Sequence, residues 1–374
     1  MFIVMGIVML AVFGSLVFYQ SWSIWRWLKP LHTRPRKIIF TVVAAALPCV
    51  FIAAMISQNA ILIAIGMYWL AIFCLLLLII PSVQLIARLL RNTSLPRESV
   101  FKWSGIAVPI LLITLLGYGS FLAYSPVVRT YDITIPKGSQ ADDPAKNTLK
   151  IVMASDMHFG ILSGKEHAVR LVERINELKP DIVLFPGDIL DDQIQPYLDN
   201  GLDQIMAAIQ APYGVYASLG NHDKYNGHIE DIINAVEAGG MKVLYDEAVT
   251  IDDRFTLLGR KDHSDTERAP LSELVQGMDA AKPLILLEHQ PYDFDIADEL
   301  GVDLMLSGHT HHGQIFPANF ITQLVFENDW GYLKKERLQS IVSSGFGFWG
   351  PPIRLGSRSE IVEINVTFSS PRAD

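Results

Sequence analysis

Four long apolar runs occupy the first third of the chain. They cover residues 2–18, 38–56, 61–80 and 106–124, with ends defined only to within several residues. A helix needs roughly 20 apolar residues to cross the hydrocarbon core of a bilayer. A single run of this kind is compatible with a buried helix of a soluble protein. Four in succession, with almost no charge, predict four membrane-spanning helices.

The first run also resembles a cleaved signal peptide in length. It lacks the basic segment that precedes such a peptide, and no pair of small residues marks a cleavage site before the aromatic cluster Tyr19, Trp22, Trp25 and Trp27. Aromatic rings are typical of the membrane–water interface. The cluster therefore predicts a helix that is retained in the protein.

Basic residues between the runs predict the orientation of the helices. Residues 20–37 contain five Lys or Arg and residues 88–102 contain four, whereas residues 57–60 contain none. Because basic loops stay in the cytoplasm, we expect both loops inside and everything after residue 124 outside. No ionisable residue lies deep in a run, which favours an anchor over an ion transporter. A groove for a lipid substrate between the helices is an alternative.

The hydrophobic pattern changes after residue 124. From there, short apolar or β-branched runs alternate with amphipathic stretches, which predicts a layered α/β domain over residues 125–374 after an anchor domain over residues 1–124. Expected strands cover residues 131–135, 149–154, 182–185, 215–219, 242–244, 256–258, 284–287, 304–306, 340–344 and 360–366. Expected helices cover residues 166–178, 198–209, 229–238 and 293–299.

Charge and cysteine content separate the two parts further. Residues 1–124 contain nine Lys or Arg and one acidic residue, so the remainder contains 21 basic and 38 acidic residues. An acidic surface argues against nucleic acid as a partner, because phosphate backbones bind basic surfaces. Both cysteines, Cys49 and Cys74, lie in apolar runs. The second part therefore has neither disulfides nor cysteine-bound zinc.

Polar clusters follow several of the expected strands. In chain order they are Asp156-Met-His158, Gly187-Asp188, Gly220-Asn221-His222-Asp223, Glu288-His289 and Gly308-His309-Thr-His311. The carboxyl ends of strands in an open α/β sheet converge on one crevice, so we expect these side chains to meet. Their oxygen and imidazole donors suit manganese, iron, zinc or magnesium. Taken alone, Asp-x-His is typical of a surface pair, His289 is compatible with a hydrogen-bonded core histidine, and the glycine-containing clusters are typical of turns. Five clusters in this order predict a metal site.

This set of clusters resembles the signature of the calcineurin-like metallophosphoesterase superfamily, which reads D-x-H, G-D, G-N-H-[DE], H and G-H-x-H. The resemblance is strong over residues 150–314 and extends more loosely to about residue 366. With the apolar helices, the chain is similar to the bacterial membrane-anchored branch, whose last motif tends toward G-H-T-H-G-G-Q. In this chain His312 stands where glycine is usual. The resemblance implies a four-layer αββα fold and a location in the bacterial inner membrane.

The resemblance also implies two divalent metal ions and their ligands. Manganese is the first expectation for both ions, with iron, zinc or magnesium as alternatives. Asp188 would bridge the ions. The first ion would further be bound by Asp156, His158 and His311, and the second by Asn221, His289 and His309.

A two-metal centre of this family implies hydrolysis of a phosphomonoester, phosphodiester or pyrophosphate by a hydroxide that bridges the ions. His222 would assist the leaving group. Asp191 stands where phosphoprotein phosphatases place the carboxylate that orients this histidine, but those phosphatases continue with arginine and this chain has Asp192. A protein-phosphatase interpretation is weakened accordingly. The anchor favours a lipid-linked or envelope substrate, by analogy alone.

Other interpretations stay open. A membrane transport or signalling protein whose esterase-like domain only binds is the alternative function, although complete ligand motifs count against it. A metallo-β-lactamase fold is disfavoured because the His-x-His-x-Asp-His cluster is absent from the sequence.

His312 is either a substrate contact or a loop residue. Arg260, Lys261 and His263 either contact a phosphate or form a solvated loop. The segment 345–352 packs over the site, touches the bilayer or closes the core. The oligomeric state is open.

Overall fold

The computed structural model describes residues 2–28, 33–57, 59–90, 93, 97–138, 144–224 and 228–370. The chain divides into two compact units, one of residues 1–120 with 350–352 and the other of residues 121–349 with 353–374. Each unit has an apolar core of its own. Lys29 and Arg91, two of the basic residues that predict the orientation, lie outside the described residues.

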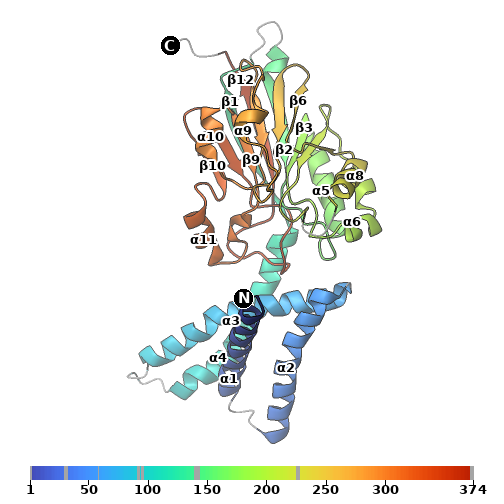
Figure 1. Ribbon diagram of the computed structural model, residues 1–374. Helices are drawn as coiled ribbons and strands as arrows, with labels where there is room; N and C mark the ends of the chain where they lie inside the picture. Colours follow the sequence, from blue (N-terminus) through green and yellow to red (C-terminus); the bar gives the residue numbers. More distant parts are fainter. Residues whose placement is uncertain are drawn as a thin grey trace. The chain divides into compact units, whose positions relative to one another are not determined.

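Long helices form the first unit. They are α1 (Phe2–Trp27), α2 (Arg34–Ile56), α3 (Ala60–Leu89) and α4 (Arg97–Tyr124), whose last turn belongs to the second unit. Figure 1 shows them in the blue to teal part of the chain. All four are long and apolar enough to cross a membrane, so the predicted number of spans is confirmed by length and composition.

Polar residues extend these helices past the predicted apolar runs. In α1, Gln20 is buried and its Nε2 donates to the main-chain oxygen of Phe73 in α3 at 2.9 Å. Ser23 of α1 accepts a hydrogen bond from the Nε2 of Gln84 in α3 at 3.2 Å. Because these polar groups have partners, they do not end the helix. The aromatic cluster therefore lies within α1 rather than after it.

Two six-stranded sheets form the second unit. The first has the order β1-β12-β2-β3-β4-β5, and the second has the order β10-β11-β9-β8-β7-β6. In the first sheet β2 to β5 run parallel, and β12 is antiparallel to β2 and parallel to β1. In the second sheet β7, β8, β9 and β11 run parallel between antiparallel edge strands. The strands are β1 (Val127–Ile135), β2 (Thr148–Met153), β3 (Ile182–Pro186), β4 (Val215–Ser218), β5 (Lys242–Val243), β6 (Glu247–Ile251), β7 (Phe255–Gly259), β8 (Leu284–Leu287), β9 (Leu304–Ser307), β10 (Gly331–Lys334), β11 (Gln339–Val342) and β12 (Glu360–Phe368).

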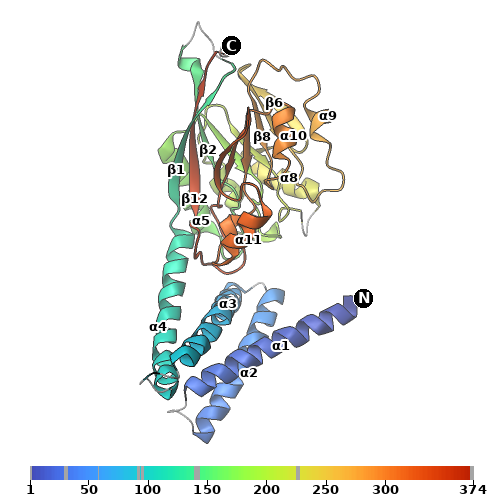
Figure 2. The ribbon, with the colours of Figure 1, turned by 90° about the vertical axis from the view of Figure 1, so that its left-hand side faces the viewer.

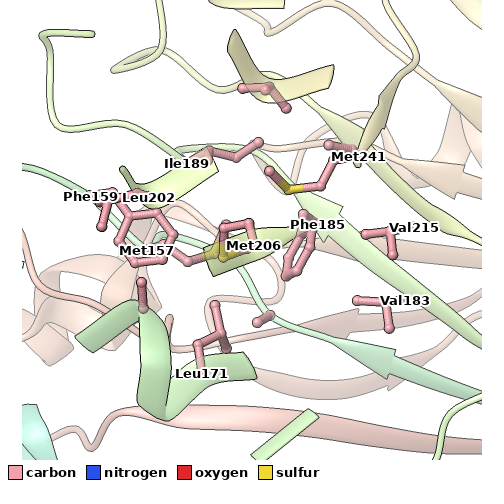
Figure 3. Close-up of a cluster of buried hydrophobic side chains, with 14 of the residues drawn as sticks. Met157, Phe159, Leu171, Val183, Phe185, Ile189, Leu202, Met206, Val215 and Met241 are labelled. Atoms are coloured by element: carbon pink, nitrogen blue, oxygen red, sulfur yellow. The ribbon is translucent and has the colours of Figure 1, made fainter. Parts of the chain in front are cut away.

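Helices cover the outer face of each sheet (Figures 1 and 2). One apolar cluster joins four helices to the first sheet through residues such as Leu171 and Phe185 (Figure 3). A second cluster, with Leu271 and Phe294, joins two helices to the second sheet, and a third lies between the sheets. These four layers confirm the predicted αββα fold. The helices are α5 (Lys165–Leu178), α6 (Gln195–Asp199), α7 (Leu202–Met206), α8 (Ile229–Ala238), α9 (Leu271–Leu274) and α10 (Phe294–Glu299).

Several elements differ from the prediction. The expected helix over residues 198–209 is instead the short helices α6 and α7, because Gly201 between them adopts a φ of 62°. The hydrophobic pattern does not predict the edge strands β6 and β10, whose residues are largely exposed or only partly buried. It also does not predict α11 (Ala318–Val325) or the short turns η3 (Pro144–Asn147) and η4 (His311–Gly313).

Candidate metal centre

The predicted site residues follow strands of both sheets. Because neighbouring parallel strands end at the same edge of a sheet, the structure brings these side chains together at the carboxyl ends of the strands. In the first sheet, Asp156 and His158 follow β2, Asp188 follows β3, and Asn221 and His222 follow β4. In the second sheet, His289 follows β8, and His309 and His311 follow β9.

Five of these residues have a backbone conformation that L-residues rarely adopt. The φ angles are 52° at Asp156, 45° at His158, 53° at Asp188, 71° at His309 and 49° at His311. Such conformations cost about 1–3 kcal/mol each and persist only where the surrounding structure fixes them. Their concentration at the predicted ligands indicates a functional constraint on this edge.

Glycines let the chain approach the two aspartates closely. A Cβ atom on Gly220 would overlap the carboxylate of Asp188. A Cβ atom on Gly308 would overlap the carboxylate of Asp156 and the side chain of Ser155. Any larger residue would displace these carboxylates, which explains why glycine stands before Asn221 and before His309.

The first group of candidate ligands contains Asp156, His158 and His311, all buried. One nitrogen or oxygen atom of each lies within 4.8 Å of the others. The Nε2 atoms of the two histidines are 3.1 Å apart, and the Nε2 of His311 lies 3.6 Å from the Oδ1 of Asp156. Asp156 is held by hydrogen bonds from the Oγ of Ser155 at 2.5 Å and from the main-chain nitrogen of His309 at 2.9 Å. These hydrogen bonds fix the position of the Asp156 carboxylate.

The second group contains Asp188, His289 and His309, again with one atom of each within 4.8 Å of the others. The Nδ1 of His289 lies 2.9 Å from the carbonyl oxygen of Pro186 and donates to it, which leaves Nε2 as the metal-binding nitrogen. Within the described ranges, the Oδ1 of Asn221 is buried without a hydrogen-bond partner, and the Nε2 of His289 has only the carboxylate of Asp188 beside it, at 3.1 Å. A buried oxygen of this kind calls for a partner, and a bound cation would supply one.

The carboxylate of Asp188 touches both groups. Its Oδ2 lies 3.1 Å from the Nε2 of His289 in the second group and 3.7 Å from the Nε2 of His158 in the first. Its Oδ1 accepts a hydrogen bond from the main-chain nitrogen of His222 at 2.9 Å. One buried carboxylate thus stands between two sets of donors, the arrangement that a bridging ligand requires.

Burial and mutual charge set the pKa values in the centre. Burial alone would raise the pKa of Asp188, but the charge of His289 holds it below its usual range. Burial lowers the pKa of His289, but the charge of Asp188 outweighs it and the pKa lies well above its ordinary value. Burial, His158 and Arg354 lower the pKa of His311 well below its ordinary value. The two groups stabilise each other's charge, and a bound metal ion would supply positive charge to Asp188 in the same place.

The partner of His222 differs from the prediction. Its Nδ1 lies 2.6 Å from the Oδ1 of Asp192, whereas the Oδ1 of Asp191 lies 3.7 Å from the Nδ1 of His158. Asp192 adopts a φ of 61°. One carboxylate oxygen of Asp191 lies within 4.8 Å of ring nitrogens of both His158 and His222, but the hydrogen bond to His222 comes from Asp192. Asp191 therefore faces the first ligand group, and the orienting contact to His222 comes from Asp192. Burial lowers the pKa of His222, but the hydrogen bond to Asp192 outweighs it and raises the pKa to about 9.

Two residues outside the expected ligand set, Asp223 and Arg354, also support the centre. The carboxylate of Asp223 accepts hydrogen bonds from the main-chain nitrogens of Leu190 and Gly220, both at 2.7 Å, and so joins the turns after β3 and β4. The buried Arg354 places its Nη2 3.2 Å from the Nδ1 of His311. Asp223 is the last residue of the Gly-Asn-His-Asp cluster, but no sequence signal marks Arg354.

Three residues whose roles the sequence leaves open make contacts within the protein. His312 places its Nδ1 2.9 Å from the Oδ2 of Asp329. Arg260 is buried and pairs with Glu288 at 3.0 Å, so it does not lie in a solvated loop. Lys261 lies over the ring of Tyr245 at 4.9 Å.

The glycine-rich segment that begins at residue 345 both closes the core and reaches the centre. Phe346 and Phe348 are buried, whereas Trp349 is exposed with its ring centroid 5.7 Å from that of His222. The main chain of Trp349 exchanges two hydrogen bonds with the side chain of Gln314, at 2.9 and 3.0 Å. The last residue of the final motif thus fixes an aromatic ring beside His222.

The chain is similar to known proteins of one family. Residues 149–313 match the family model of calcineurin-like phosphoesterases. An uncharacterised metallophosphoesterase of Aquifex aeolicus is 36% identical over 69% of this chain and 98% of its own length. One of Campylobacter jejuni is 31% identical over 81% of this chain and 80% of its own length. A transmembrane protein with a metallophosphoesterase domain from Danio rerio is 29% identical over 80% of this chain and 71% of its own length.

The central position of Asp188 predicts the metal content of variants. We expect Asp188→Asn to lose metal from both groups, because the lost carboxylate charge touches both. Asp303→Asn, which changes a buried carboxylate at the opposite end of β9, should keep it. Elemental analysis of the purified full chain measures the metal content of both variants. The wild type, for which we expect two ions per chain, is the reference. Fewer than two ions in the wild type, or loss of only one in Asp188→Asn, would contradict the bridging position.

Proposed function

We propose that this chain, which belongs to the calcineurin-like metallophosphoesterase family, hydrolyses a phosphoester with a pair of divalent metal ions. The observation that carries the proposal is the buried carboxylate of Asp188 between two groups of donors. The bond cleaved is that of a phosphomonoester, a phosphodiester or a pyrophosphate, since all three suit paired ions that polarise phosphoryl oxygens.

The donors present fit divalent cations. Carboxylate, amide and imidazole ligands without any thiolate suit manganese best, with iron, zinc or magnesium as alternatives. When bound, such ions supply Lewis acidity and make a water nucleophilic near neutral pH. Asp156, His158 and His311 would hold one ion, Asn221, His289 and His309 the other, and Asp188 both.

His222 has the geometry of a proton donor to the leaving group. Asp192 accepts the hydrogen bond of its Nδ1, which fixes the ring and leaves Nε2 to face the reacting phosphate. The ring lies 5.0 Å from that of the candidate ligand His158, so it borders the centre. Asp192 acts through His222 and is a positioning residue, whereas Asp191 lies nearer to the first ligand group.

The four candidate spans support a membrane-bound or envelope substrate. By the positive-inside rule, the basic loops favour the outer side of a bacterial inner membrane for the catalytic unit. An enzyme tied to the bilayer in this way meets lipid-linked phosphoesters at high local concentration. We therefore include a lipid-linked phosphoester among the substrates of the proposal.

Leaving-group dependence tests the proposed function and the role of His222. The purified full chain with manganese should hydrolyse soluble phosphate mono- or diesters, and a chelator should abolish this activity. His222→Ala should lower kcat on alkyl esters by roughly 10²–10⁴, the usual contribution of acid–base catalysis, while bound metal stays at the wild-type level. Esters of 4-nitrophenol need little protonation of the leaving group and should lose much less.

Two matched variants complete this experiment. Asp192→Asn should follow His222→Ala in its leaving-group dependence, whereas Asp191→Asn should lower both classes of ester alike, because it lies beside His158. Equal losses on both classes of ester in His222→Ala would remove the proton-donor role. If the metal-loaded wild type turns over no mono-, di- or pyrophosphate ester, the proposed hydrolysis is wrong. That result would support the alternative, a transport or signalling protein whose esterase-like domain only binds.

The side of the membrane is tested by labelling. Ala248 lies exposed on the edge strand β6, and the two native cysteines lie in the membrane helices α2 and α3. With Cys49 and Cys74 replaced by alanine, Ala248→Cys should react with a membrane-impermeant maleimide in intact spheroplasts. Reaction only after the membrane is permeabilised would place the catalytic unit in the cytoplasm and would remove envelope substrates.

A further inference from the structure

Helix α11 (Ala318–Val325) of the second unit turns its apolar side away from the protein. Phe320, Ile321, Leu324 and Val325 stand at helix positions i, i+1, i+4 and i+5, which lie on one side. They are 54%, 61%, 87% and 58% exposed, and no residue of the helix is buried. Phe316, 51% exposed, packs edge-on against Phe320 at 5.7 Å and extends this side. We call these five residues the α11 surface.

The opposite, polar side of α11 is tied to the candidate metal centre. The Oγ1 of Thr322 lies 2.7 Å from the Oδ2 of Asp329, which is also the partner of His312 Nδ1 at 2.9 Å. The helix packs against η4, which contains the candidate ligand His311. These contacts fix the rotation of the helix, so its apolar side stays outward. An amphipathic helix in a soluble domain has the reverse arrangement.

The attachment of the second unit to the membrane indicates what covers this surface. The last turn of the candidate span α4, residues 121–124, belongs to the second unit. Leu122 and Ala123 are buried there, and the carbonyl of Leu122 accepts a hydrogen bond from the main-chain nitrogen of Ser359 at 3.2 Å. Strand β1 begins at Val127, so only two residues separate the span from the sheet. The bilayer in which α4 ends is therefore held close to the unit by its own chain.

The α11 surface lies at the same end of the second unit as this attachment (Figures 1 and 2). Residues 316–325 include no charged side chain, and two of the five apolar side chains are aromatic. A short uncharged apolar face with phenylalanines suits the boundary between headgroups and acyl chains. A contiguous apolar surface left in water would be a site of association instead.

We propose that the α11 surface docks onto the lipid bilayer and holds the candidate metal centre at the headgroups. Because α11 is joined through Asp329 and η4 to the loop that carries His309 and His311, the docked helix places this loop at the membrane. The phosphoester substrate would then be an amphiphile that stays in the bilayer during reaction. The amphiphilic substrate rests on the proposed phosphoesterase function, whereas the docking of the α11 surface does not.

Fluorescence quenching in the full chain tests the docking. With Cys49 and Cys74 replaced by alanine, Leu324→Cys carries an environment-sensitive dye, and the protein is reconstituted into vesicles of phosphatidylcholine and phosphatidylglycerol. A nitroxide on the lipid headgroup region should quench this dye several-fold more than the same dye at Gln323→Cys, and aqueous iodide several-fold less. Gln323 is exposed on the same helix but off the apolar side, and Ala248→Cys on β6 is the distant control.

Two results would overturn the docking. Iodide quenching at position 324 equal to that at position 323 would leave the surface in water. Protection from iodide without quenching by the lipid nitroxide would mean that protein covers the surface, either a second copy or a partner.

A matched pair of diesters with the same leaving group tests the substrate clause. Bis(4-nitrophenyl) phosphate is soluble, and hexadecyl 4-nitrophenyl phosphate stays in the vesicle. The double variant Ile321→Gln with Leu324→Gln should lose several-fold in rate on the vesicle-borne diester and keep the wild-type rate on the soluble one. Equal loss on both would overturn the substrate clause. Absence of turnover of any ester by the wild type would be a failure of the proposed function, and the quenching result would still decide the docking.

Discussion

The candidate centre depends on the contact of one buried carboxylate, that of Asp188, with histidines of both ligand groups. This carboxylate lies within 3.7 Å of a histidine from each ligand group, and a second buried carboxylate, Asp156, belongs to the first group. Ionised carboxylates are costly to bury unless positive charge balances them. The positive φ angles after β2, β3 and β9 and the glycines at 220 and 308 all serve to bring these carboxylates and imidazoles together. The local strain is thus a consequence of one electrostatic requirement.

Much of the fold and of the centre could be predicted because the determining signals are local. Buried parallel strands read as short apolar runs, and the polar residues directly after them must meet at one edge. Asp156, His158, Asp188, His289, His309 and His311 come together in this way. The four candidate membrane spans are equally evident, since spanning length and lack of charge are properties of the sequence alone.

The features that the sequence could not predict depend on side-chain contacts that form only in the folded chain. Asp191 and Asp192 have the same side chain, and only the folded chain shows that Asp192 makes the hydrogen bond to His222 while Asp191 lies between His158 and His222. The ends of α1 and α3 depend on partners that the polar residues find in another helix. The apolar residues of α11 resemble a core-facing stripe in sequence, but the contact of Thr322 with Asp329 turns them outward. Such features follow from tertiary packing and not from periodicity.

The two-ion centre can be tested by anomalous X-ray diffraction from crystals of the full chain grown with manganese. Data collected at the manganese absorption edge should show two anomalous peaks on either side of the Asp188 carboxylate, roughly 3.5–4 Å apart. One peak should lie beside Asp156, His158 and His311, and the other beside Asn221, His289 and His309. A single peak, or peaks that do not contact Asp188, would contradict a bridging role for that carboxylate.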